Sequence, residues 1–560
     1  MRRILVVAAA AAAASRPTGP ADLILRNTAV YTMVDRVPKA QAVAIRAGKV
    51  VYVGDNAGAE AWAGDSTEAL DLAGRMVLPG FHDTHVHLSG GVSLDECTLD
   101  GLTTQQAVVD SVKRCAAAKP DTTWLRGRGW ALPVFPNANP RREWLDQVVA
   151  ARPAFLVAAD GHSAWASTKA LALAGITKAT VDPPNGRIER DPRTGEPSGT
   201  LRESAMDLVE TKIPPRTAEE LKKGLRRGVQ LANSFGITTV HEASMSSELA
   251  AAYATLDREH QLTARAIGAF YVDPVKGVGQ VDSMVALRKR FSGGTYFRPT
   301  AAKIFADGVI EAKTAALLAS YSDGSTSRGM PNFRPALLDS IVEALDRAAF
   351  QVHIHAIGDG AIRMSLDALE KARKANGPRD ARPIIAHLEL FDPADIPRFK
   401  QIGVIASFQP LWAYADEYIT QLTEPILGPA RSRWLYPIAS VVKTGATVAA
   451  GSDWTVSSMN PLEAIQVAIT RRAPTDSTAG PPWIPEEVVD LTTMLKAYTV
   501  AGARAAFDET IDGTIEVGKA ADLVVLDRDL YKIPPHQIHR AKVLLTLLDG
   551  REVYRDRALP

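Results

Sequence analysis

The chain has 560 residues, of which 46% are hydrophobic and 23% charged, close to the average for soluble globular proteins. Its 64 Lys and Arg residues balance 63 Asp and Glu residues, so it lacks the basic excess of nucleic-acid-binding proteins. The apolar content suffices for a large core, which excludes general disorder.

The first residues form a segment of their own. Met1-Arg2-Arg3 precedes an Ala-rich apolar run that ends at Ser15. A basic start and a short apolar run closed by small residues are typical of a secretory signal peptide. The run is shorter than the ~20 residues that span a bilayer. We therefore expect residues 1–20 to be signal peptide and linker, and the mature protein to be periplasmic or extracellular without a membrane span. A start codon placed too far upstream is the alternative.

The only two cysteines are Cys97 and Cys115. In an exported protein such a pair predicts a structural disulfide, with two buried thiols as the alternative. Because the chain has no cysteine cluster, a metal site in it must use His, carboxylate or modified Lys.

Both ends of the chain are rich in short strands. Residues 22–55 alternate apolar and polar positions around a Gly-containing turn, and TIEVGKAADLVVLD and AKVLLTLLDGREVYRD repeat this texture near the C-terminus. We predict one small β-sandwich-like domain built from 21–75 and 508–560.

The middle of the chain alternates strands with amphipathic helices, which favours a parallel sheet. Eight strands are predicted, the number in a TIM barrel; they are 76–87, 236–243, 264–271, 298–307, 351–358, 382–389, 402–409 and 445–453. We therefore predict an α/β fold with a (β/α)8 barrel over 76–507. The connection after the first strand is too long for a loop, so 88–235 is predicted to be an inserted subdomain.

Candidate metal ligands fall at the ends of these strands. His85 and His87 share one face of the first strand, where two imidazoles can bind one metal ion. Lys303, His387 and Asp453 lie in the fourth, sixth and eighth strands. Because the C-terminal ends of barrel strands converge, we expect these side chains to meet at one mouth.

The fifth strand offers two histidines on the same face, His353 and His355. We favour His355 as a ligand because it lies nearer the C-terminal end of the strand, with His353 as the alternative. Lys303 stands among apolar residues that can lower its pKa. The neutral amine can then react with carbon dioxide to give a carbamate that bridges two cations, or Lys303 can simply pair with Asp307.

Five segments resemble a known group in sequence and in order: VLPGFHDTHVH, KIFADGVIEAKTAAL, VHIHAIGDGAI, IIAHLEL and AAGSDWTVSSMNPLEAI. They resemble the amidohydrolase superfamily, and more closely amidohydrolase family 3, the branch with N-substituted formamide deformylase and the YtcJ-like metal-dependent hydrolases. The resemblance covers nearly the whole mature chain.

The resemblance implies a centre of one or two zinc ions. His85 and His87 would bind the more buried ion together with Asp453. Lys303, carboxylated, would bridge to a second ion held by His355 and His387. His82 and His241 depart from the family pattern, and we interpret both as hydrogen-bonded core residues, with an extra polar group in the mouth as the alternative.

Such a centre predicts hydrolysis by metal-activated water. Asp453 would act as general base and then pass the proton to the leaving nitrogen. His162, in a polar turn after an apolar strand, would donate a hydrogen bond to the carbonyl oxygen. We expect cleavage of the C–N bond of a linear N-acyl or N-formyl amide. A deaminase, an esterase or lactonase, or an inactive barrel that binds a small ligand are the alternatives.

Residues for substrate binding are sought in the loops and the insertion. Aromatic and polar side chains there suit an apolar amide, or else pack the insertion against the barrel. They are Trp130, Trp165, Tyr321, Gln409, Trp412 and Trp454. The partner expected is a small-molecule amide and not nucleic acid, and a homo-oligomer is compatible with the sequence.

Overall fold

The computed structural model describes residues 19–118, 123–149, 152–475 and 480–559. The predicted signal peptide lies outside the described residues. Within those ranges, every helix is too short or too polar to cross a membrane.

Eight parallel strands form a single sheet in which each strand pairs with the next one of the barrel. They are β8 (Phe81–Val86), β15 (Ile237–Met245), β16 (Arg265–Tyr271), β17 (Phe297–Phe305), β18 (Gln351–Ala356), β19 (Ile384–His387), β20 (Ile405–Phe408) and β21 (Val448–Ala450). The first and last strands approach each other, because Thr84 Oγ1 donates to the Ala450 carbonyl at 2.9 Å. The sheet is thus nearly closed, and the predicted TIM barrel is confirmed.

Helices cover the outside of the barrel. The main ones are α6 (Ala218–Ser234), α7 (Ser247–Arg258), α8 (Gln280–Phe291), α9 (Pro335–Arg347), α10 (Asp359–Asn376), α11 (Ile396–Ile402), α14 (Ile438–Lys443), α15 (Pro461–Thr470), α16 (Leu491–Ala497) and α17 (Val500–Ala506). α6 begins with a capping box, in which Thr217 Oγ1 accepts from Glu220 N at 3.2 Å and Glu220 Oε2 accepts from Thr217 N at 2.8 Å. Its apolar face, which includes Leu225 and Val229, belongs to the barrel core.

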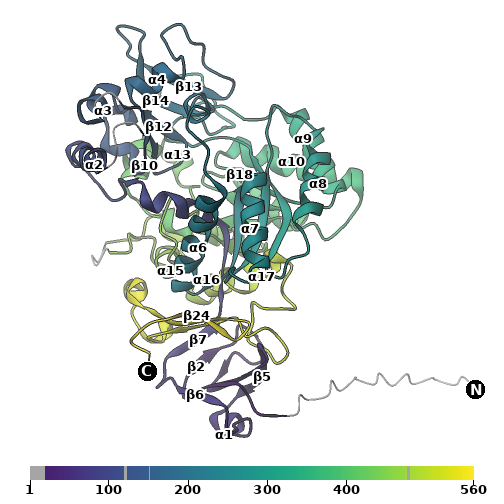
Figure 1. Cartoon of the computed structure of the whole chain (residues 1–560). Helices are drawn as coiled ribbons and strands as arrows, with labels where there is room; N and C mark the ends of the chain where they lie inside the picture. The colour runs from purple at the N-terminus through teal and green to yellow at the C-terminus, as the bar shows by residue number, and fades with distance from the viewer. Residues whose placement is uncertain (1–18, 119–122, 150–151, 476–479, 560) are drawn as a thin grey trace, which may run out of the picture.

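Strands from both ends of the chain form two further sheets at the bottom of Figure 1. One contains β1 (Leu23–Arg26), β4 (Ala42–Arg46), β5 (Lys49–Gly54) and β6 (Glu68–Asp71). The other contains β2 (Ala29–Tyr31), β3 (Lys39–Ala40), β7 (Met76–Pro79), β22 (Leu523–Leu526), β23 (Val543–Leu548) and β24 (Arg551–Arg555). Val43 and Ile45 of the first sheet share an apolar core with Val525 and Leu545 of the second.

The strand predicted over 76–87 divides in two at Gly80. Met76–Pro79 pairs with β22 in the terminal sheet, and Phe81–Val86 begins the barrel. A Cβ on Gly80 would lie 2.3 Å from Thr238 Oγ1, so the chain changes sheets where only glycine fits.

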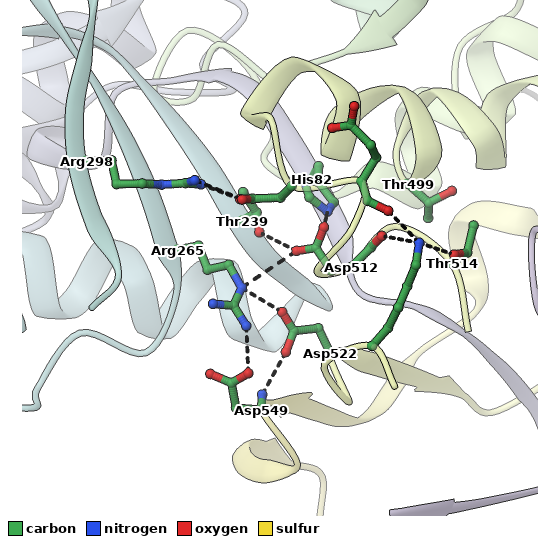
Figure 2. A network of polar contacts seen from close by, with 12 residues as sticks. His82, Thr239, Arg265, Arg298, Thr499, Asp512, Thr514, Asp522 and Asp549 are labelled. Carbon is green, nitrogen blue, oxygen red and sulfur yellow. Dashed lines mark hydrogen bonds and ion pairs between the residues drawn. The ribbon is translucent and has the colours of Figure 1, made fainter. Parts of the chain in front are cut away.

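A polar network joins the terminal sheets to the N-terminal ends of the barrel strands (Figure 2). Arg265 of β16 lies between three aspartates, with Nε 2.9 Å from Asp522 Oδ2 and Nη2 2.7 Å from Asp549 Oδ1. The Nε atom of Arg265 also lies 3.6 Å from Asp512 Oδ2. The other carboxylate oxygen of Asp512, Oδ1, lies 3.3 Å from His82 Nε2. The core interpretation of His82 is therefore supported.

The segment between β8 and β15 holds a six-stranded sheet at the opposite end of the barrel, at the top of Figure 1. Its strands are β9 (Cys97–Thr98), β10 (Leu125–Trp130), β11 (Ala154–Ala158), β12 (Ser163–Ala166), β13 (Gly186–Arg190) and β14 (Pro197–Glu203). Cys97 in β9 and Cys115 in α2 (Gln105–Ala117) form a disulfide, as the sequence predicts. α6 lies inside the predicted insertion range but packs on the barrel.

A candidate metal centre at the barrel mouth

The predicted metal ligands come from different strands and meet at one end of the barrel. His85 lies in β8, one residue before its end, Lys303 lies in β17, His355 in β18 and His387 at the end of β19, and all four are at least 98% buried. Asp453 follows β21. His87, which directly follows β8, is more exposed than the others.

Asp453 is the point where these side chains converge. Its Oδ1 lies 3.2 Å from His87 Nε2 and 3.5 Å from His85 Nε2, and its Oδ2 lies 4.0 Å from His387 Nδ1. The ring centroids of His85 and His387 are 4.6 Å apart, and those of His387 and His355 are 4.4 Å apart. The arrangement places the imidazoles around one carboxylate.

Two buried atoms of this group have no hydrogen-bond partner, namely Asp453 Oδ1 and His387 Nδ1. Ligand atoms of His85, His387 and Asp453 all lie within 4.8 Å of one another. Buried polar atoms without partners are costly unless they bind an ion or a ligand, and imidazole with carboxylate is a donor set that zinc accepts. The residues present therefore fit a metal ion.

The two histidines of β18 have different surroundings. His353 Nε2 lies 2.9 Å from His85 Nδ1, within hydrogen-bond distance. His355 lines the open cavity, and its Nε2 lies 3.1 Å from the Gly308 carbonyl oxygen. Since His355 faces the cavity and His353 contacts a ligand from below, the geometry favours His355 as the ligand and His353 as the residue that orients His85.

Lys303 is buried beside one of the candidate ligands. Its side chain is fully buried, with Nζ 3.1 Å from His85 Nε2 and 4.5 Å from the centroid of the Phe305 ring. Burial lowers the pKa of the Lys303 amine to about 7, although the Asp453 carboxylate opposes that shift. A large share of this amine is therefore neutral at neutral pH.

Backbone strain and close packing fix the ligands in place. His387 and Asp453 have φ angles of +75° and +52°, in the left-handed region that is costly for residues with a side chain. Asp83 accepts hydrogen bonds from His85 N at 3.1 Å and Ser452 N at 3.0 Å, and thereby ties the two loops together. A Cβ on Gly451 would lie only 2.6 Å from His85 N, so glycine is required at this approach.

His162, the predicted hydrogen-bond donor, reaches the mouth from the insertion. Its ring centroid lies 5.1 Å from that of His355, and its Nδ1 lies 2.8 Å from Glu203 Oε2. Burial alone would lower the pKa of His162, but the Glu203 carboxylate, with Asp160 and Asp453, outweighs it and raises the pKa to about 9. His162 is thus held protonated and aimed at the mouth.

A cavity of about 370 Å³ opens beside the centre. His162, His355, His387 and Asp453 line it, together with Trp412, whose ring stacks on His387 with centroids 5.5 Å apart. The candidate ligands therefore lie beside a cavity that is large enough for a small molecule.

Five of the six predicted substrate contacts do not line this cavity, and Trp412 is the one that does; the five are Trp130, Trp165, Tyr321, Gln409 and Trp454. Trp130 is fully buried in the insertion core, where its Nε1 donates to the Leu156 carbonyl at 2.8 Å. Tyr321 is also buried and donates to the Ala315 carbonyl at 2.8 Å. Trp454 lines a neighbouring pocket. The prediction that Trp130 and Tyr321 contact substrate is therefore wrong, because their polar atoms bind backbone carbonyl groups. Trp165, which was also predicted to contact substrate, is fully buried.

Sequence reasoning gave no role to Glu203 or Glu242, and it considered Asp307 only as a partner of Lys303. Glu203 holds His162, and Glu242 lies 3.8 Å from His87 Nδ1. Asp307 accepts from the backbone of Ala316, Ile357 and Gly358, and so fixes the loops after β17 and β18. Glu203 ends β14 in the segment GEPSGTLRE, which also resembles amidohydrolase family 3, and no other signal in the sequence indicates it.

His241 sits inside the barrel with both ring nitrogens buried and without partners. Burial, His82 and Arg298 lower its pKa to about 3, so its ring is neutral. It does not line the cavity. The interpretation of His241 as a core residue is supported. The hydrogen bond expected for its ring is not found among the described residues.

Comparison with known proteins agrees with this geometry. A sequence profile of the amidohydrolase family matches residues 68–554. The chain is 32% identical to Protein LONG AFTER FAR-RED 3 of Arabidopsis thaliana, covering 95% of this chain and 92% of the relative. It is 29% identical to N-substituted formamide deformylase of Arthrobacter pascens, covering 94% and 97%.

Among solved structures, an uncharacterized metal-dependent hydrolase from Pyrococcus horikoshii OT3 superposes with a TM-score of 0.72 at 25% identity. The match covers 92% of this chain and 99% of that one. The similarity therefore spans the barrel, the insertion and the terminal sheets together.

Proposed function

This chain belongs to the amidohydrolase family, and we propose that it hydrolyses the C–N bond of a linear N-acyl or N-formyl amide with the help of bound zinc. The observation that carries the proposal is the convergence of His85, His387 and Asp453, whose buried Oδ1 makes no hydrogen bond, beside an open cavity. The similarity to N-substituted formamide deformylase supports a linear amide as the substrate.

We propose His85, His87, His355, His387 and Asp453 as the residues that hold one or two ions, with carboxylated Lys303 between them. When bound, such an ion lowers the pKa of a coordinated water from 15.7 to about 7. Two observations support the carbamate. Lys303 Nζ lies beside His85, and the lowered pKa of the buried amine favours its neutral form, which is the form that reacts with carbon dioxide.

The proposed role of Asp453 is to take a proton from the attacking water and to give it to the leaving nitrogen. His162 donates a hydrogen bond to the carbonyl oxygen as negative charge develops there, and Glu203 keeps that imidazole protonated. His353 orients His85 from the barrel interior. Trp412, stacked on His387, excludes water from one wall of the cavity.

Replacing Asp453 by Asn tests the proton transfer. Asn keeps an oxygen that can bind a metal but cannot accept the proton, so we expect Asp453→Asn to retain metal and to lose roughly 10²–10⁴-fold in kcat. Metal content by mass spectrometry and turnover of N-formyl and N-acyl amides would be measured on the same preparation. A rate near that of the unchanged protein would remove Asp453 from the role of general base.

Product analysis separates the alternatives. Release of a substituted amine supports the proposed amide hydrolysis, whereas ammonia or an alcohol would indicate a deaminase or an esterase. A stable preparation without metal would indicate a ligand-binding barrel.

We also propose that the protein acts outside the cytoplasm on a small molecule. The disulfide between Cys97 and Cys115 supports this proposal, because such bonds persist in oxidising compartments.

A further inference from the structure

Three carboxylates from different loops line the cavity beside the metal centre. Glu311 follows β17, Glu389 follows β19 and Asp416 follows β20, and we call them the acidic cluster. Among the described residues that line the cavity, none is Lys or Arg. The carboxyl groups of the acidic cluster therefore have no lysine or arginine counter-ion on the cavity wall, and the protonated His162 is already paired with Glu203.

Glu389 is the member that keeps one oxygen without a partner, although its side chain also pairs with Tyr436. It is 3% exposed, and its Oε1 is buried without a hydrogen bond. The other two are held in place, because Glu311 Oε1 accepts from Thr423 Oγ1 at 2.7 Å and Asp416 Oδ1 accepts from Ile419 N at 2.9 Å. A buried carboxyl oxygen without a donor, in a residue that lines a cavity, is a position where a ligand can supply the donor.

The acidic cluster adjoins the metal centre within one cavity. Burial raises the pKa of Glu311 to about 7, and the nearby Asp160 and Asp416 carboxylates add to that shift. Burial and Glu311 likewise raise the pKa of Glu389 well above its usual range. The carboxyl groups of the cluster therefore stand close together without a counter-ion of their own.

A positive group bound there is better explained as organic than as a second kind of metal ion. Within the described parts of the chain, only His85, His387 and Asp453 bring three ligand atoms within 4.8 Å of one another. The acidic cluster is too widely spaced for that, and Tyr418 and Tyr436 also line its cavity. Aromatic faces beside carboxylates are typical of sites for substituted ammonium groups.

We propose that the substrate is an amide that also carries a positively charged amine, bound by Glu389 and Glu311 while the scissile amide lies at His387 and Asp453. This inference rests on the proposed function and specifies its substrate. An N–H donor of the ammonium group pairs with the free Glu389 oxygen, and the aromatic walls cover its methylene groups.

Matched substrates test the charge. N-acyl diaminoalkanes of increasing length would be compared with N-acyl alkylamines in which a methyl group replaces the ammonium group. At the best chain length we expect kcat/KM to be about tenfold or more higher for the charged substrate, the size of a hydrogen bond to a charged group. Equal or higher kcat/KM for every neutral partner would overturn the inference.

Variants of the carboxylates assign the site. Glu389→Gln and Glu311→Gln should each reduce kcat/KM for the charged substrate about tenfold and leave the neutral one little changed. Glu463→Gln makes the same chemical change in another carboxylate of the cavity and should leave the preference intact. Loss of the preference in Glu463→Gln alone would place the cation elsewhere. Thermal unfolding of each variant would show whether it folds. Because Glu389→Gln and Glu311→Gln are tested separately, the test remains valid if one of them misfolds.

Direct binding separates this inference from the proposed function. Calorimetric titration of the metal-loaded protein with an N-alkyl diaminoalkane, which has no amide to cleave, should show binding that Glu389→Gln weakens about tenfold. If no amide is hydrolysed but this binding is present, the proposed reaction fails and the cation site stands. If amides are hydrolysed and no diaminoalkane binds, the reaction stands and the cation site fails.

Discussion

At the scale of single residues, the pair of His162 and Glu203 makes activity depend on pH. Glu203 raises the pKa of His162 to about 9, so the donor is charged below that pH and is lost as the pH rises through it. In Glu203→Gln the pKa falls toward the ordinary value of about 6.5. We expect the alkaline limb of the kcat/KM profile to move down by at least ~1 pH unit.

The control for this prediction is Glu196→Gln, which changes a carboxylate of the same segment that does not line the cavity. Its pH profile should match that of the unchanged protein. If Glu203→Gln loses activity uniformly at every pH, Glu203 serves the fold of the loop and not the charge of His162.

The sequence predicts those site residues whose role depends on a strand end. His85, Lys303 and His387 could be placed because the C-terminal ends of barrel strands must converge. Glu203 and Glu389 could not, since their partners are set by how the insertion and the loops close over the mouth. Trp130 shows the reverse error, because an aromatic residue in an insertion is equally suited to the insertion's own core, where it lies.

At the scale of elements, the disulfide fixes α2 against the sheet of the insertion. Cys97 and Cys115 are 18 positions apart, and a loop of about this length is worth ~3 kcal/mol of unfolding free energy in the chain-entropy account. We expect Cys97→Ser with Cys115→Ser to lower the urea midpoint of the insertion correspondingly, measured by tryptophan fluorescence. Reductant should lower the midpoint of the unchanged protein and not that of the double variant. Equal sensitivity of both would contradict the prediction.

The boundaries of elements were harder to predict than their types. Met76–Pro79 and Phe81–Val86 lie within one predicted strand, yet they belong to two sheets. Periodicity cannot reveal that division, because both strands are buried on both faces. α6 was likewise placed in the insertion, although its apolar face packs on the barrel.

At the scale of the whole molecule, the ends of the chain are joined to the barrel through buried charges. Arg265 balances Asp522 and Asp549 and lies near Asp512 (Figure 2). Arg265→Met keeps the volume of the side chain but leaves buried carboxylates without a counter-ion, which typically costs about 3–5 kcal/mol. We expect a loss of that order in urea unfolding. Arg36→Met, which removes an exposed pair with Glu516, should cost less than about 1 kcal/mol.

The sign of the pH dependence gives a second test of the same network. Burial raises the pKa of Asp522 to about 6 even with Arg265 present, and removal of the arginine raises it further. A carboxyl group whose pKa is higher in the folded than in the unfolded state destabilises the fold above that pKa, and protonation relieves the cost as the pH falls. The stability lost in Arg265→Met should therefore be smaller near pH 5 than near pH 8. An equal loss at both values would mean that Arg265 acts through packing and not through its charge.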